Sequence, residues 1–352
     1  MSEINFGIIG TGRMAATMMA ALTAASGVKI LAVSSESKDR AASFAKFHAI
    51  PQAYHGIDAL LRDERIDAVY IANATENHYQ STLSALNAGK AVLCEKPIAI
   101  SASESKEIEQ AAARAGKLCM EAMWTFFLPT YQRLFKSYEE TELGTPLYLY
   151  SDFGYPVSKE VSPRLYASTV GSGVLLDRGV YPIALALKLF GPVNQILGKV
   201  DRTPEGVDIH AALQLFHNNG AESQLAVSFR VLLQNRAVLS STGGSISLEP
   251  PVIGAESIRI SRASLELPTL GIQSLSIKER LKQHLRQSSL LRRINTIKSA
   301  GKLEHHTYGG NQYLPLINHF CELYRTDKLV SNVFSLSAST QVLEVIDQAN
   351  KL

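Results

Sequence analysis

Residues 4–15 read INFGIIGTGRMA, and this stretch decides how the first part of the chain folds. Its first six residues are mostly apolar and predict a buried strand, and the residues from Arg13 onward have helical period. The backbone between them must turn tightly and approach a ligand closely, so Gly10 and Gly12 lack side chains, while the small Ala15 lets helix and strand pack. Free N–H groups at the start of a helix bind phosphate. The turn therefore favours dinucleotide binding over an ordinary strand-to-helix connection.

The same alternation of strand and helix continues to about residue 120. Short apolar runs predict strands at 4–9, 29–33, 68–72, 91–94 and 118–120, and helical period predicts helices at 13–25, 38–47, 78–88 and 103–115. Ser101 and Glu104 form a capping box, and Gly89 and Gly116 stand where helices should end. This pattern is typical of a parallel sheet covered on both faces, and we expect a Rossmann NAD(P)-binding domain over residues 1–122.

A different pattern begins after Trp124. Strands are expected at 148–153, 195–200, 209–216, 223–229 and 236–241, with one helix at 180–190 among them. Consecutive strands without helices between them predict a large, open, mostly antiparallel sheet. The fold class is therefore α/β, with an α+β domain for substrate binding and oligomerisation over residues 123–352. Two helices, at 314–324 and 336–349, are expected to pack back near the domain junction.

Composition excludes several classes of protein. The chain has 352 residues, of which 46% are hydrophobic and 19% charged, so a disordered or fibrous protein is excluded. No apolar run approaches the roughly 20 residues of a membrane-spanning helix, and the first strand begins too early for a signal peptide, so we expect a cytoplasmic protein. The three cysteines are far apart and lack CxxC spacing, so we expect neither a disulfide framework nor a metal site.

The formal charge of +3 is unevenly distributed. Residues 276–302 hold eight basic residues and one acidic residue, which leaves the rest of the chain slightly acidic. This segment also carries Ile and Leu at helical spacing, so it predicts a basic amphipathic helix that docks on a membrane or nucleic acid, or packs on its own sheet or a twin subunit. We favour packing and expect no nucleic-acid or membrane partner, because no aromatic residue is interleaved to stack on bases.

The end of the second expected strand governs the choice of nucleotide. Ser35, Lys38 and Arg40 would bind the 2′-phosphate of NADP, whereas Glu36 would hold the ribose hydroxyls of NAD. Both cofactors remain open, and the three donors favour NADP.

Lys96, Asp177 and Tyr181 are the candidates for chemistry. Lys96 follows the strand at 91–94, on the sheet edge where ligands of parallel sheets bind, although an isolated lysine in a loop is more often solvated. Asp177 and Tyr181 are four residues apart at the start of a helical segment, which places them on one face. Taken alone, Asp177 is more often a helix cap and Tyr181 more often part of the packing.

Four ordered motifs resemble the glucose-fructose oxidoreductase and inositol dehydrogenase family, Gfo/Idh/MocA, and within it the branch of the dimeric dihydrodiol and sugar dehydrogenases. They are GTGRMA (10–15), GKAVLCEKPIAIS (89–101), EAMWTFFLP (121–129) and PRLYASTVGSGVLLDRGVYP (163–182). The resemblance covers nearly the whole chain. It implies an NAD(P)-dependent dehydrogenase of sugars, polyols or trans-dihydrodiols that is a dimer or tetramer, with dimers forming through the open face of the second sheet.

The resemblance also implies roles for particular residues. Lys96 would reach the nicotinamide and the substrate hydroxyl, Tyr181 would be the acid and base, and Asp177 would assist. The expected cofactor contacts are Gly10, Thr11, Gly12, Arg13, Met14, Ser35, Glu36, Lys38, Arg40, Ala72, Asn73, Asn77, His78, Glu95 and Lys96. Trp124, Phe127, Arg164 and Tyr181 would contact substrate. The pKa of a phenol is about 10, and we expect Lys96 beside Tyr181 to bring that pKa toward neutrality.

Two positions depart from the family pattern. Ser172 stands where related sequences have a middle glycine, and Phe126 stands where the branch has arginine, which removes a charge near the expected pocket. An alternative function is a sensor or regulator of the same fold that binds NAD(P) or sugar without chemistry. Intact Lys96, Asp177 and Tyr181 argue against that alternative.

Overall fold

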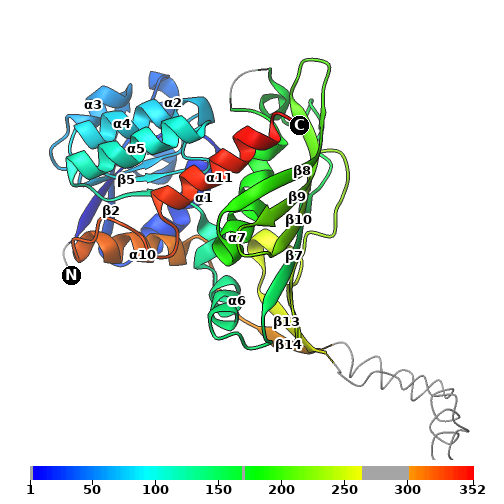
Figure 1. Cartoon of the computed structure of the whole chain (residues 1–352). Helices are drawn as coiled ribbons and strands as arrows, with labels where there is room; N and C mark the ends of the chain where they lie inside the picture. The colour runs from blue at the N-terminus through cyan, green and yellow to red at the C-terminus, as the bar shows by residue number, and fades with distance from the viewer. Residues whose placement is uncertain (1–2, 169–170, 264–300) are drawn as a thin grey trace, which may run out of the picture.

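The computed structural model describes residues 3–168, 171–263 and 301–352 (Figure 1). The expected basic helix lies in residues 276–302, and all of that segment except its last two residues is outside the described part of the chain. The described residues form two lobes, each built on one β-sheet.

The first lobe contains a parallel six-stranded sheet with the order β3-β2-β1-β4-β5-β6. Its strands are β1 (Ile4–Ile9), β2 (Val28–Ser35), β3 (Gln52–His55), β4 (Ala68–Ile71), β5 (Ala91–Cys94) and β6 (Cys119–Glu121). This is the Rossmann order, and the direction of winding changes between β1 and β4. The expected parallel sheet is confirmed. β3 was not expected, because it is a short edge strand whose residues are half-buried or exposed.

Four helices cover this sheet where helical period predicts them: α1 (Arg13–Ala24), α2 (Lys38–His48), α4 (His78–Asn87) and α5 (Ala102–Ala115). The short α3 (Ile57–Leu61) was not expected. Ser101 caps α5 by accepting a hydrogen bond from the Glu104 N–H, and Gly116 ends the helix in the left-handed conformation.

The second lobe contains an eight-stranded sheet with the order β14-β13-β12-β11-β7-β10-β9-β8. Its strands are β7 (Pro146–Gly154), β8 (Val193–Arg202), β9 (Asp208–His217), β10 (Glu222–Ser228), β11 (Ala237–Ser241), β12 (Gly244–Leu248), β13 (Ser257–Arg262) and β14 (Lys302–His305). All pairs are antiparallel except β7 with β10, so the expected mostly antiparallel sheet is confirmed.

The remaining helices are α6 (Pro129–Glu139), α7 (Val180–Phe190), α10 (Leu314–Arg325) and α11 (Leu336–Ala349). α6 and α7 pack on the second sheet, α10 packs on the first lobe, and α11 contacts both lobes. Figure 1 shows α11 crossing between the first lobe and the second sheet. On the first lobe, Phe320 of α10 packs against Phe6 at a ring distance of 5.6 Å, and Thr340 of α11 bonds Ser105 of α5 at 2.9 Å. The end of the chain therefore packs on the domain with which the chain begins.

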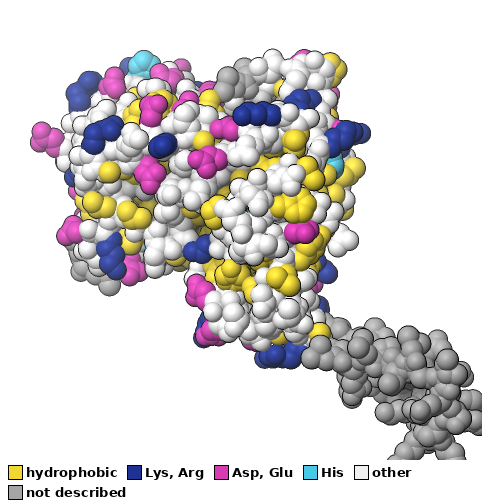
Figure 2. All heavy atoms as spheres, viewed as in Figure 1, with side chains coloured by type: hydrophobic (Ala, Val, Ile, Leu, Met, Phe, Trp, Pro, Cys, Tyr) yellow, Lys and Arg dark blue, Asp and Glu magenta, His cyan; other side chains and the backbone are white. Residues whose placement is uncertain are grey.

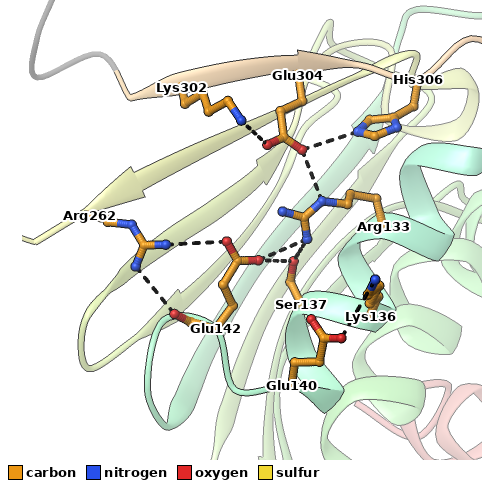
Figure 3. Close-up of polar contacts among 9 residues, drawn as sticks. All are labelled: Arg133, Lys136, Ser137, Glu140, Glu142, Arg262, Lys302, Glu304 and His306. Carbon is orange, nitrogen blue, oxygen red and sulfur yellow. Dashed lines mark hydrogen bonds and ion pairs between the residues drawn. The ribbon is translucent and has the colours of Figure 1, made fainter.

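A charged network fixes α6 to the far end of the second sheet (Figure 3). Arg133 of α6 bridges Glu142 and Glu304, each at 3.0 Å. Glu304 of β14 also forms hydrogen bonds with Lys302 and His306. These hydrogen bonds lower the pKa of Glu304 to about 2, and the bond from Lys302 has the largest effect. This network lies away from the residues proposed above for chemistry.

Cys94, Cys119 and Cys321 are free buried thiols. Within the described ranges we find no cluster of side chains able to hold a metal ion. No helix of the described chain is both long and apolar enough to cross a membrane.

Candidate functional site

A cleft of about 1170 Å³ opens at the carboxyl ends of the strands of the first sheet. One wall comes from the loops after β1, β2, β4 and β5, and the other comes from residues 155–165 and 171–177 of the second lobe. Ligands of open parallel sheets bind at this edge, beside the point where the winding reverses.

The turn after β1 forms the floor of the cleft. Gly10 has a φ of +109°, and a Cβ atom there would lie 2.6 Å from the carbonyl oxygen of Ala72, so only glycine fits. Gly12 is the N-cap of α1 and has no capping side chain, which leaves the first N–H groups of the helix to a ligand. Thr11, Arg13 and Met14 also line the cleft.

The end of β2 brings together some of the residues expected at the ribose. Ser35, Glu36 and Arg40 line the cleft, whereas Lys38 does not. The Ser35 hydroxyl accepts from the Ser37 N–H at 3.2 Å and from the Thr11 hydroxyl at 3.5 Å, so its own hydrogen stays available to a ligand oxygen.

The loop after β4 presents a buried acceptor. Ala72, Asn73, Asn77 and His78 all line the cleft as expected. Asn73 donates to the Ser81 hydroxyl at 2.8 Å, but its buried Oδ1 has no hydrogen-bond partner among the described residues. An unpaired buried acceptor is costly, and a donor on a bound ligand would satisfy it. The residues therefore fit a dinucleotide, through the Gly10 cradle and this free acceptor.

His78 supports the loop that carries Lys96. Its Nδ1 lies 2.7 Å from the carbonyl oxygen of Pro97, and a carbonyl oxygen only accepts, so Nδ1 must carry the hydrogen. Burial lowers the pKa of His78 to about 4. The imidazole is therefore neutral near pH 7.

Lys96 lies at the centre of the site. Its Nζ donates to the carbonyl oxygen of Asp177 at 2.7 Å and to Asp177 Oδ1 at 3.3 Å, and it lies 5.1 Å from the ring centroid of Tyr181. Burial alone would lower the pKa of Lys96, but electrostatic interactions with Tyr181, Asp177 and Glu95 raise it above its usual value. Lys96 therefore remains an ammonium.

The two acidic neighbours of Lys96 differ in their burial. Glu95 is buried and accepts from the Tyr70 hydroxyl at 2.5 Å. Burial raises the pKa of Glu95 above its usual value. Asp177 is one-third exposed and lines the cleft. Asp177 therefore presents its carboxylate to both Lys96 and the cleft.

Tyr181 is buried beside Lys96 and does not line the cleft, and its hydroxyl accepts a hydrogen bond from Trp124 Nε1 at 3.2 Å. Burial raises the pKa of Tyr181 to about 12, and Lys96 and Trp124 only partly offset that effect. The expectation that Lys96 brings this pKa toward neutrality is therefore wrong for the protein without ligand. Desolvation of a buried phenolate outweighs the nearby ammonium.

Asp177 and Tyr181 come together through an irregular turn. Residues Leu175–Gly179 form one π-helical turn, which is followed by α7 with Gly179 as its N-cap. Asp177 is therefore not the cap of α7. Asp208 stabilises this turn, because its Oδ2 accepts a hydrogen bond from the Leu175 N–H at 2.7 Å. π-Helical turns occur frequently at functional sites.

The residues expected to contact substrate have different environments. Arg164 lines the cleft and donates to the Thr75 hydroxyl of the opposite wall at 2.5 Å. Trp124 touches Tyr181 and packs on Tyr313 at a ring distance of 5.0 Å. Neither Trp124 nor Phe127 lines the cleft, and Phe127 is buried against His319.

The two departures from the family pattern have structural accounts. Phe126 is fully buried, packs against Phe135 and Phe334, each at 5.2 Å, and does not line the cleft. Ser172 donates to the carbonyl oxygen of Ala167 at 2.5 Å and so joins the local turn.

Sequence reasoning missed several residues of the site. The cleft wall that includes Tyr155 and Val157 carries no motif, and Tyr70 reads as an ordinary apolar strand residue. Arg178 was also missed, although a charged residue directly after Asp177 in an otherwise apolar segment could have indicated a role in the site.

Comparisons with known proteins place both halves of the chain in one family. Residues 4–123 match the model described as "Oxidoreductase family, NAD-binding Rossmann fold", and residues 131–247 match the Gfo/Idh/MocA C-terminal domain. The trans-1,2-dihydrobenzene-1,2-diol dehydrogenase of Sus scrofa is 30% identical over 70% of this chain and 75% of its own length. An uncharacterized oxidoreductase of Rhizobium meliloti is 30% identical over 71% of this chain and 75% of its own length.

Solved structures share the fold. A 3-ketoreductase from Actinomadura kijaniata, in complex with NADP and TDP-benzene, superposes with a TM-score of 0.78 at 20% identity and covers 98% of this chain and 96% of its own. An oxidoreductase from Agrobacterium radiobacter, in complex with NAD⁺, L-tartaric acid and magnesium, has a TM-score of 0.76 at 18% identity and covers 98% of this chain and 95% of its own. These two relatives hold different nicotinamide cofactors.

Proposed function

We take as our premise that the chain belongs to the Gfo/Idh/MocA family of NAD(P)-dependent oxidoreductases, and we propose that it transfers a hydride between nicotinamide and a secondary alcohol or ketone of a sugar, polyol or trans-dihydrodiol. The observation that carries this proposal is the Lys96 ammonium at the end of a strand that faces the dinucleotide cleft. It donates to the carbonyl oxygen of Asp177 at 2.7 Å and to the carboxylate at 3.3 Å, and it lies over the ring of Tyr181. The dihydrodiol dehydrogenases among the relatives support this substrate class.

The cofactor contacts follow from the walls of the cleft. We propose that the pyrophosphate lies at the turn of Gly10, Thr11 and Gly12, and that the free Oδ1 of Asn73 accepts from a donor on the cofactor. We propose NADP as the preferred cofactor, with its 2′-phosphate between Ser35 and Arg40. Lys38 does not line the cleft, so we propose no direct contact between it and the cofactor.

The bound nicotinamide supplies the hydride chemistry. In reduction, the Tyr181 phenol gives its proton to the carbonyl oxygen of the substrate as the new C–H bond forms. In oxidation, the phenolate takes the hydroxyl proton as the C–H bond breaks. Lys96 polarises the same oxygen in both directions. Because burial raises the pKa of Tyr181 to about 12, the free protein holds this proton at neutral pH and is set to donate it.

The test is a panel of sugars, polyols and trans-dihydrodiols with NADP and NAD, read by the absorbance of the reduced nicotinamide. We expect turnover with at least one member of the panel, and oxidation that speeds up toward high pH. Tyr181→Phe should reduce turnover by about 10² or more and leave cofactor binding unchanged. Tyr54→Phe is the matched control, because it removes a phenol hydroxyl that bonds Asp63 away from the cleft.

Two outcomes would contradict the proposal. Wild-type turnover by Tyr181→Phe would remove the assigned acid and base. A silent panel alongside tight cofactor binding would support the non-catalytic sensor instead.

We also propose that the protein is a homo-oligomer, a dimer or tetramer, through the open face of the second sheet. Hydrophobic side chains gather on the lobe of that sheet in Figure 2, and Leu147 of β7 and Leu197 of β8 are about half exposed, at 48% and 47%. The molecular mass from light scattering checks this proposal.

A further inference from the structure

Arg178 is a buried cation directly beside the proposed catalytic residues. Its side chain is 1% exposed, and charged residues are rarely buried to that extent unless they are paired. One nitrogen, Nη1, donates to the carbonyl oxygens of Tyr155, at 2.8 Å, and of Ser228. The other two nitrogens, Nε and Nη2, have no hydrogen-bond partner among the described residues.

Aromatic rings enclose this guanidinium. Its central carbon lies 3.7 Å from the ring centroid of Tyr155, 4.6 Å from that of Phe229 and 5.5 Å from that of Phe153. A guanidinium over an aromatic face is attracted by the negative charge of that face, most strongly where water is excluded. The three rings therefore compensate part of the cost of burying the charge.

The same guanidinium lies close to the Asp177 carboxylate and to a ring that packs against Tyr181. Nε lies 3.7 Å from Oδ2 of Asp177, while Oδ1 of the same carboxylate takes the bond from Lys96 at 3.3 Å. Phe153 packs nearly perpendicular to the ring of Tyr181 at 5.9 Å. Arg178 thus contacts the carboxylate that holds Lys96 and a ring that packs against Tyr181.

We propose that Arg178 is a positioning residue, which holds the Asp177 carboxylate by its Oδ2 so that Lys96 and Tyr181 keep the geometry needed for catalysis. Without the guanidinium, the carboxylate turns fully toward Lys96 and draws the ammonium away from the substrate oxygen. This inference rests on the proposed function, because it assigns Arg178 a place in that reaction.

The test is a double-mutant cycle on the active enzyme. Arg178→Met removes the charge at similar length, and we expect kcat to fall about 10-fold or more with unchanged affinity for the reduced cofactor, measured by its fluorescence. Arg178→Lys should recover part of kcat, because it keeps the charge. If Arg178 acts through Asp177, the double variant with Asp177→Asn should be no slower than Asp177→Asn alone, within about two-fold.

Arg133→Met is the matched control, because it removes a partly buried, ion-paired arginine of the network far from the cleft. Its kcat should equal that of the wild type, even where its Tm falls as much as that of Arg178→Met. Wild-type kcat in Arg178→Met, or independent effects that multiply in the double variant, would overturn the inference. Failure of the proposed function is a separate result, because then the wild type itself turns over no member of the substrate panel.

Discussion

Glu121 shows how strongly burial controls the charges beneath the site. It is the last residue of β6, 4% exposed, and its Oε1 accepts from the Ile98 N–H at 3.3 Å, in the loop that follows Lys96. Burial raises its pKa to about 7, against the opposing effects of Ser339, Ile98 and Lys96, while the charge of Glu95 adds to the increase. The carboxyl therefore titrates near neutral pH.

This pKa predicts a pH-dependent stability. The folded pKa of Glu121 lies above its value in the unfolded chain, so its stabilising contribution is complete below about pH 4.5 and is lost as the pH rises through about 7. Glu121→Gln keeps an acceptor for Ile98 and never ionises. We expect it to stabilise the protein at pH 8 on the order of 1–3 kcal/mol relative to wild type, and by much less at pH 5. Equal effects on urea unfolding at the two pH values would contradict this prediction.

Single residues also mark the limit of sequence reasoning about the site. Lys96 and Asp177 are 81 positions apart, yet both were identified, because a strand end and a helix start place them at predictable edges and the family motifs that contain them imply their roles. The pKa of Tyr181 and the burial of Arg178 were not foreseen, since each depends on what surrounds the side chain. Sequence gives the donor and acceptor types, but desolvation is set by the tertiary fold.

At the scale of elements, helices and strands with a clear apolar pattern were predicted from the sequence, and those without one were missed. β5, α7 and α11 have the bounds expected from their apolar residues. β14 and α6 were missed because β14 is a short, polar edge strand and α6 follows a run of buried aromatic residues without a clear period. The π-helical turn at Leu175–Gly179 was not expected: the sequence predicts a helix from residue 180 with Asp177 at its start, because the geometry of a π turn has no simple sequence signature.

The glycine before this π-helical turn carries a prediction. Gly173 has a φ of +96°, and a Cβ atom there would lie 2.0 Å from Oδ1 of Asp208, the residue that holds the Leu175 N–H. Gly173→Ala must therefore displace Asp208 and shift the turn that carries Asp177. We expect a loss of about 2–4 kcal/mol in the free energy of unfolding and a fall in kcat of about 10-fold or more.

Gly206→Ala is the control for backbone strain alone. Gly206 has a similar φ of +89°, but nothing lies within 4 Å of the added Cβ atom. It should lose about 1 kcal/mol of stability and keep the wild-type kcat. If the two variants lose the same stability and activity, the contact with Asp208 does not hold the turn.

At the scale of the whole molecule, α11 and its flanking residues join the two lobes. Asp347 of α11 accepts from the Ala102 N–H at the start of α5, at 3.1 Å. On the other side, Arg202 of β8 donates to the carbonyl oxygen of Asn350 at 2.8 Å, and Lys188 of α7 donates to that of Val333 at 3.3 Å. Each lobe therefore loses contacts if the other unfolds.

We expect calorimetry to show one unfolding transition, although the chain has two sheets. Asp347→Ala removes a carboxylate that accepts from the Ala102 N–H and faces the positive end of the α5 dipole. We expect this change to lower the free energy of unfolding by about 1 kcal/mol. Because the contact crosses between elements of both lobes, the single transition should move down by about 1–3 °C and stay single. Ser101→Ala removes the local cap of the same helix and serves as the matched control for helix stability. If the transition splits in Asp347→Ala but stays single in Ser101→Ala, the Asp347 contact alone couples the unfolding of the two lobes. Two transitions in the wild type would contradict the coupling.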